Sequence, residues 1–122
     1  MLSPNLQQFI ARYVDSMETL EILLLLQRAP DTFWTPSAID SHLGMKSGVA
    51  ENRLRGLLEN NFVTKGISGG YRYNARGEER RVAVLALAAA YAETRAEVVN
   101  AVYSENLNRL RAFSDAFRVK SE

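Results

Sequence analysis

Residues 35–75 carry the signals for two short helices followed by a β-hairpin, and this order constrains the fold more than any other stretch of the chain. Thr35 and Pro36 form a typical helix start. A threonine side chain can cap the first turn, and proline at the first helical position loses no hydrogen bond. Gly44 then supplies the residue that most often ends a helix. The sequence therefore predicts a short helix that begins after Thr35 and ends at Gly44.

A second helix is predicted to start near Lys46 and Ser47 and to stop at Asn60 and Asn61. Asparagine is suited to a helix end because, among the residues other than glycine, it most often adopts the left-handed backbone conformation. The apolar side chains of this helix recur at the spacing of one helical face, at Ala50, Leu54, Leu57 and Leu58.

Two strand-like segments follow, at residues 62–65 and 71–73. The segment between them, residues 66–70, contains three glycines, which is typical of a turn that joins paired strands. We therefore expect a hairpin. Phe33 and Trp34, just before the first short helix, are interpreted as a further short strand.

Two helices are predicted before this region. The first opens at Ser3 and Pro4. Asp15 begins the second, and Glu18 three residues later completes a capping box. This second helix includes the leucine run at residues 23–26, which is apolar on nearly all sides and should form the centre of the core.

Together these elements resemble the winged helix-turn-helix domain of bacterial transcription regulators, over roughly residues 16–77. The resemblance implies a mostly α-helical fold with a small β-wing. It also implies that the helix at about 46–60 enters the major groove of double-stranded DNA while the wing at 62–75 contacts the neighbouring backbone or minor groove. Arginine and asparagine can read bases, while lysine, serine and wing arginines more often bind phosphate. The DNA-binding residues implied by the resemblance are Lys46, Ser47, Asn52, Arg53, Arg55, Lys65 and Arg72.

The last part of the chain, residues 78–122, contains neither glycine nor proline and is predicted to form one long helix. From Val82 to Phe117, positions spaced alternately three and four residues apart carry apolar side chains, and Asn106 is the one exception. This spacing is the heptad pattern of a coiled coil. Such a helix would be ~60 Å long, whereas a compact domain of this size is only about 30–35 Å across. The helix must therefore bend back or pack against a second chain.

These patterns divide the chain into a winged helix-turn-helix domain at residues 1–77 and a C-terminal dimerisation helix at residues 78–122. A long dimerising C-terminal helix after such a domain most resembles the phenolic-acid-decarboxylase-regulator and antibiotic-resistance-regulator groups. One side of the segment from Val82 to Ala92 is expected to close the core, and the other side is free for a partner. The predicted dimer contacts are Val82, Leu85, Val99, Tyr103, Asn106, Leu110, Phe113 and Phe117.

Charge is distributed unevenly along the chain, although the net charge is only +1. Residues 1–45 hold two basic and five acidic side chains, a net charge of −3. Residues 46–81 hold eight basic and four acidic side chains, a net charge of +4. The positive excess coincides with the predicted recognition helix and wing, where a phosphate backbone would lie.

Several classes of function are not supported by the composition. The chain has no cysteine and a single histidine, His42, so we expect neither a thiolate nor a histidine-rich metal site. No residue spacing matches a phosphate loop, a nucleophile elbow or a histidine–carboxylate cluster. We therefore expect that the chain has no catalytic residues, binds no cofactor and is not an enzyme. No apolar run reaches the ~20 residues of a membrane span, and the N-terminal residues lack the pattern of a signal peptide. We therefore expect a cytoplasmic location.

Two functions from different classes remain. The first is a homodimeric DNA-binding transcription regulator, and the second is a winged-helix module that binds another protein. They differ in whether the cationic side chains of the helix and wing converge on one surface. The sequence identifies neither the DNA sequence that would be bound nor a small-molecule effector.

Overall fold

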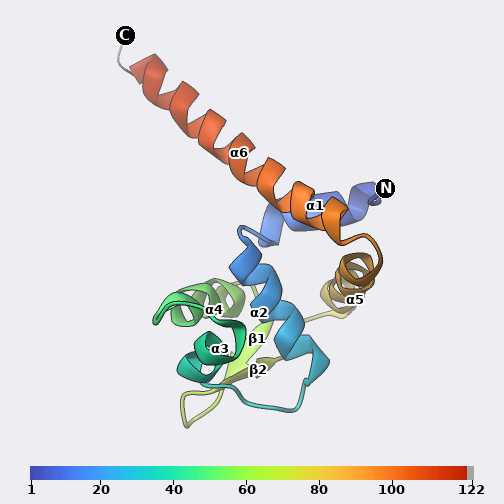
Figure 1. Ribbon diagram of the computed structural model, residues 1–122, viewed down its shortest axis with the longest axis vertical. Helices are drawn as coiled ribbons and strands as arrows, with labels where there is room; N and C mark the ends of the chain where they lie inside the picture. Colours follow the sequence, from blue (N-terminus) through green and yellow to red (C-terminus); the bar gives the residue numbers. More distant parts are fainter. Residues whose placement is uncertain (121–122) are drawn as a thin grey trace.

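The computed structural model describes residues 1–120, and their side chains except those of residues 109, 110 and 113–120. Within residues 1–120 the chain forms six helices and one two-stranded antiparallel sheet (Figure 1). The expectation of a mostly helical fold with a small sheet is confirmed in this coarse form. In chain order the elements are α1 (Pro4–Tyr13), α2 (Met17–Arg28), α3 (Pro36–Leu43), α4 (Val49–Glu59), β1 (Val63–Lys65), β2 (Tyr71–Tyr73), α5 (Glu78–Glu93) and α6 (Arg95–Lys120).

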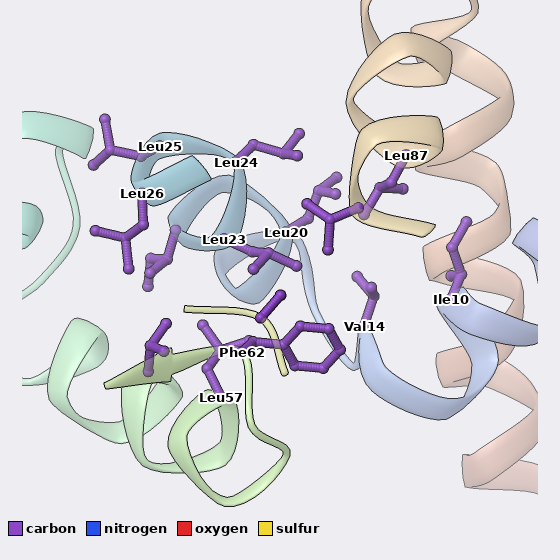
Figure 2. Packing of buried hydrophobic residues seen from close by; sticks show 14 of the residues in the cluster. Ile10, Val14, Leu20, Leu23, Leu24, Leu25, Leu26, Leu57, Phe62 and Leu87 are labelled. Atoms are coloured by element: carbon purple, nitrogen blue, oxygen red, sulfur yellow. The ribbon is translucent and has the colours of Figure 1, made fainter. Parts of the chain in front are cut away.

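Helix α2 lies at the centre of the core, as its leucine run predicts. It packs against α4, α5 and β2, and all five residues from Ile22 to Leu26 are buried. Figure 2 shows the leucines of this helix together with Leu57 of α4, Phe62 before β1 and Leu87 of α5. Helix α2 therefore contributes to the core on most of its circumference, because it has a neighbour on several sides.

The cap of α2 differs from the predicted one. Ser16, and not Asp15, is the capping residue, and its hydroxyl oxygen accepts a hydrogen bond from the backbone N–H of Thr19 at 3.1 Å. Asp15 instead accepts a hydrogen bond from the Thr19 hydroxyl at 2.7 Å. Glu18 lies beside Arg53 of α4. The predicted capping box is wrong because Ser16, next to Asp15, caps the helix instead. The helix start is thereby shifted by one residue, and Glu18 pairs with Arg53 and not with the cap.

Helix α3 begins and ends as predicted. The Thr35 hydroxyl accepts a hydrogen bond from the backbone N–H of Ala38 at 3.2 Å. Gly44 follows the helix with φ of +68°, in the left-handed region. Most residues with a β-carbon are disfavoured there, so the backbone conformation favours glycine at this position.

Helix α4 begins at Val49, later than the predicted start near Lys46 and Ser47. The carboxylate of Asp40, a buried residue of α3, explains the difference. It accepts hydrogen bonds from the backbone N–H groups of Gly48 at 3.1 Å and Ala50 at 2.9 Å. This side chain supplies the cap that α4 lacks locally, since Gly48 has no side chain. Residues 46–48 are thereby held in a turn between the two helices.

The end of α4 and the hairpin agree with the sequence prediction. Asn61 has a φ of +65°, the left-handed conformation expected of an asparagine at a helix end. Strands β1 and β2 pair with Thr64 opposite Arg72. The expected third strand is reduced to a single bridge, in which Trp34 and Tyr71 exchange two backbone hydrogen bonds of 2.8 and 2.7 Å.

The predicted single helix over residues 78–122 is wrong, because the helix breaks at Thr94. This residue has φ of −134° and ψ of 56°, outside the helical region. Its backbone N–H and its hydroxyl both donate to the carbonyl oxygen of Ala90, at 2.7 and 3.0 Å. Threonine can end a helix without glycine or proline, because its hydroxyl bonds the preceding turn. Helix α6 therefore starts in a new direction from α5 (Figure 1).

Helices α5 and α6 each bury one apolar side and expose another. Val84 and Leu87 of α5, and Val98 and Val102 of α6, are fully buried. Among the described side chains of these helices, the large exposed apolar ones are Val82, Leu85, Tyr103 and Leu107. The first half of α6 packs on α1, while its C-terminal half extends away from the rest of the chain (Figure 1). In residues 1–120, no helix is long and apolar enough to cross a membrane.

Replacing Asp40 with alanine is expected to destabilise the fold by ~1–3 kcal/mol, because the N–H groups of Gly48 and Ala50 lose their acceptor. Asp40→Asn keeps one acceptor oxygen and is expected to lose less. Urea unfolding checks the prediction, with Asp31→Ala as the control because Asp31 is exposed. Equal free energies of unfolding for Asp40→Ala and Asp31→Ala would show that Asp40 does not hold α4.

Candidate nucleic-acid interface

Helix α4 presents one apolar face to the core and one polar face outward. Ala50, Leu54 and Leu57 are buried, whereas Asn52 and Arg55 are exposed. Lys46 and Ser47, in the turn before the helix, are exposed as well. Four of the seven predicted DNA-binding residues therefore lie in the turn or on the outward face of α4 and are accessible to a ligand.

Arg53 is directed toward α2 and not outward. Its guanidinium lies 3.7 Å from the Glu18 carboxylate, and its Nε atom is buried and makes no hydrogen bond within the described part of the chain. Arg53 and Asn52 line a cavity of about 60 Å³ between the start of α2 and α4. A space of this size holds a few waters, whereas ligand pockets usually measure about 300–1,000 Å³. This cavity therefore does not suggest an effector site.

The exposed outward face of α4 also carries acidic side chains. Arg55 lies 3.9 Å from Glu51, one turn away on the same helix, and Glu59 is exposed near the end of the helix. Exposed pairs of this kind contribute little to stability. The acidic side chains nevertheless lower the positive potential of this face. The face is therefore less positive than the excess of basic residues in the sequence had suggested.

The two predicted cations of the hairpin lie on opposite faces of the sheet. Residues paired across an antiparallel ladder share a face, and neighbours along a strand alternate. Lys65 pairs with Tyr71 and Arg72 pairs with Thr64, so the two cations belong to different faces. The Lys65 ammonium lies 5.5 Å from the centre of the Tyr71 ring. The hairpin consequently presents a cation on each side instead of a single basic face.

Phe33 positions the hairpin, a role that the sequence analysis did not identify. A β-carbon at Gly66 would lie 2.8 Å from the Phe33 ring, and one at Gly70 would lie 3.2 Å from the Phe33 β-carbon. The guanidinium of Arg72 lies 5.4 Å from the centre of the same ring. The glycines thus allow Phe33 to pack against the hairpin, and Phe33 in turn supports Arg72 by a cation–π contact.

Arg80 is an internal cation of the positive segment. Its guanidinium donates to the carbonyl oxygen of Asn60 at 3.0 Å and to the Tyr13 hydroxyl at 3.3 Å. It also lies 5.4 Å from the centre of the Tyr13 ring and 5.6 Å from that of Phe62. Arg80 therefore links α5 to α1 and to the end of α4, and its charge is not free for a ligand.

Tyr73 marks the end of the hairpin nearest α5. Burial raises the pKa of its hydroxyl above the usual value of 10.0, and the nearby positive charge of Arg81 lowers it in part. Arg81 and Arg76 are exposed. These two arginines are the further cations next to the hairpin that the sequence analysis counted but did not assign.

The predicted dimer contacts do not form one continuous stripe. Val82, Leu85 and Tyr103 are each more than half exposed, and Val99 and Asn106 are half-buried. The break at Thr94 separates the residues of α5 from those of α6. The side chains of Leu110, Phe113 and Phe117 lie outside the described residues.

The described residues show no arrangement typical of a metal site. Among them, no group of three or more histidine, aspartate or glutamate side chains could hold an ion. His42, the single histidine of the sequence, packs edge-on against Trp34, with ring centres 5.2 Å apart.

Replacing Arg80 with alanine is expected to destabilise the fold by ~1–3 kcal/mol, because the Asn60 carbonyl loses its partner and two aromatic rings lose their cation. Arg76→Ala is the matched control, since it removes an exposed arginine four residues away and should change stability by less than ~0.5 kcal/mol. Thermal unfolding of the two variants checks the difference. If both variants unfold at the same temperature as the wild type, Arg80 does not link the elements that surround it.

Comparison with known proteins adds no identification. No family model matches the chain, and no similar curated protein or solved structure was found. The function must therefore be inferred from the geometry of the chain itself.

Proposed function

We propose that the chain is a homodimeric DNA-binding transcription regulator of the winged helix-turn-helix type. The observation that carries the proposal is the arrangement of α3, α4 and the hairpin. Two helices meet at a turn fixed by Asp40, the second has an accessible polar face, and a hairpin with a protruding turn follows it. A helix of this kind fits the major groove, and a hairpin beside it can reach the adjacent backbone or minor groove.

The residues of the site take different roles in this proposal. Asn52 and Arg55 are exposed on α4 and can read base edges. Lys46 and Ser47, at the start of the helix, and Lys65 and Arg72 on the hairpin are suited to phosphate contacts. Arg53 lies beside Glu18, so we assign it the task of orienting α4 against α2 instead of base reading.

Dimerisation through α6 completes the proposal. Helix α6 has 26 residues and α1, which covers its first half, has 10. At 1.5 Å per residue α1 spans only ~15 Å of a helix ~39 Å long. Tyr103 and Leu107 stand one turn apart on the exposed side of α6. Packing against the same helix of a second copy would remove both from water, and the resulting dimer would carry two copies of α4.

The DNA-binding proposal predicts two kinds of variant. Lys65→Ala should weaken binding to all duplexes alike and lower the slope of log Kd against log salt by about one unit, because one phosphate contact is lost. Arg55→Ala should instead reduce the preference for selected over random sequence by ~1–3 kcal/mol. Titration of labelled duplexes at several salt concentrations measures both effects.

Arg12→Ala serves as a control for these titrations, since it removes an exposed arginine from α1, outside the proposed site. If wild-type protein shows no affinity for duplex DNA even at low salt, the proposal fails. It also fails if Lys65→Ala and Arg55→Ala have the same effect as the control.

If the chain dimerises through α6, replacing both Tyr103 and Leu107 with lysine should yield a monomer. The two lysines of each copy would face the same charges on the other copy across the interface. Ser104→Lys with Asn108→Lys is the matched control, since both residues are also exposed on α6. Light scattering distinguishes the two outcomes. A wild-type chain that is monomeric at high micromolar concentration would contradict the prediction.

A protein-interaction module is the second candidate function. The observation in its favour is the dispersal of the cations, with Lys65 and Arg72 on opposite faces and Arg53 and Arg55 beside carboxylates. A mixed surface of this kind suits a protein partner as well as DNA. The same duplex titration separates the candidates, because a module that binds only protein would show no salt-dependent affinity for duplex DNA.

A further inference from the structure

Among the side chains that the structure describes, the most exposed large apolar one belongs to Ile67. This side chain is fully exposed at the tip of the hairpin turn, which we define as residues 66–70. The hairpin turn protrudes from the chain at the end opposite to the C-terminal end of α6 (Figure 1). An isoleucine in this position contributes nothing to the core.

The conformation of the turn does not require an isoleucine either. The backbone N–H of Gly69 donates to the carbonyl oxygen of Gly66 at 3.1 Å, which makes residues 66–69 a β-turn with Ile67 in its second position. That position favours proline or small polar residues, and nothing in turn geometry favours a β-branched apolar side chain. Neither packing nor turn chemistry therefore explains Ile67.

The hairpin turn is held firmly, so the position of Ile67 is fixed. The Gly66 N–H donates to the Gly70 carbonyl oxygen at 2.7 Å, which closes the turn. Phe33 packs against Gly66 and Gly70 from one side. The bridge between Trp34 and Tyr71 ties the base of the turn to the rest of the chain. A ligand would meet a preformed apolar tip.

Positive charges flank this tip on both faces of the sheet. Lys65 precedes the hairpin turn on one face, and Arg72, supported by Phe33, follows it on the other. An apolar tip between two cations matches the minor groove of DNA, which is about 6 Å wide and is bordered by a phosphate backbone on each side.

We propose that Ile67 enters the minor groove of bound DNA and acts as an apolar wedge against a base step, with Lys65 and Arg72 on the two flanking backbones. Proteins that bind the minor groove use isoleucine, leucine and phenylalanine in this way, and partial unstacking of the step bends the duplex. Flexible pyrimidine–purine steps unstack most easily, so the wedge would favour sites that carry such a step under the turn. This inference rests on the proposed DNA-binding function.

The test compares Ile67→Ser and Ile67→Val with the wild type in duplex titrations at several salt concentrations. Serine is suited to the turn position, so the fold should be retained. Loss of the apolar contact is expected to weaken binding about tenfold without changing the salt slope, because isoleucine releases no counterions. Ile67→Val removes one methylene and should stay within about fourfold of the wild type. Ser68→Ala, at the next position of the turn, is the matched control.

The groove is tested separately with netropsin, a small ligand that occupies the minor groove of A·T-rich DNA. Netropsin should displace the wild-type protein from an A·T-rich duplex, and a complex that resists netropsin would overturn the placement of Ile67 in the minor groove. If the wild type binds DNA and Ile67→Ser binds with the same affinity, the wedge is overturned while the DNA-binding function stands, and Ile67 becomes a candidate contact for another protein. If the wild type does not bind DNA, both proposals fail.

Discussion

Burial of α2 is the constraint on which the rest of the structure depends. Seven of its twelve residues are buried, and the helix packs against α4, β2 and α5, which follow it in the sequence. Full burial of a leucine or isoleucine side chain contributes ~1.5–3 kcal/mol, so this one helix supplies a large share of the favourable free energy. Helices α4 and α5 and strand β2 cannot all contact α2 unless the chain wraps around it.

Polar side chains then set the orientation of elements that the apolar core alone would leave free to slide. Asp40 bonds two backbone N–H groups at the start of α4, and Arg80 bonds a backbone carbonyl oxygen at its end. In both cases the side chain belongs to another helix. Helix α4 is therefore fixed at its two ends by α3 and α5, while its outward face remains accessible. A recognition surface of any kind, for DNA or protein, benefits from such support.

The sequence was most informative where a residue determines its own conformation. Thr35, Gly44 and Asn61 adopt the predicted cap and left-handed conformations, because their effect is local. Asp40 could not be identified in this way, since its partners lie eight and ten residues further along the chain. The break at Thr94 was missed because threonine is compatible with a helix, and the alternating spacing of apolar residues continues through it. Heptad counting records spacing and does not detect a change of direction.

The candidate site was predictable in composition but not in geometry. Whether Lys65 and Arg72 share a face depends on the register of the hairpin, because a shift of one residue moves a side chain to the other face. Whether Arg53 faces outward depends on the rotation of α4 about its axis, which Asp40 and the core decide. The sequence therefore indicated which cations lie in the region, while their directions required the folded chain.

The most direct test of the central claim is a residue-by-residue map of the DNA-binding surface in solution. Amide chemical shifts of the 122-residue chain would be recorded during titration with a short random-sequence duplex. The account predicts that the largest changes fall on residues 46–59 and on the hairpin turn, with α2 unaffected. Changes confined to α5 and α6, or no changes at low salt, would contradict it.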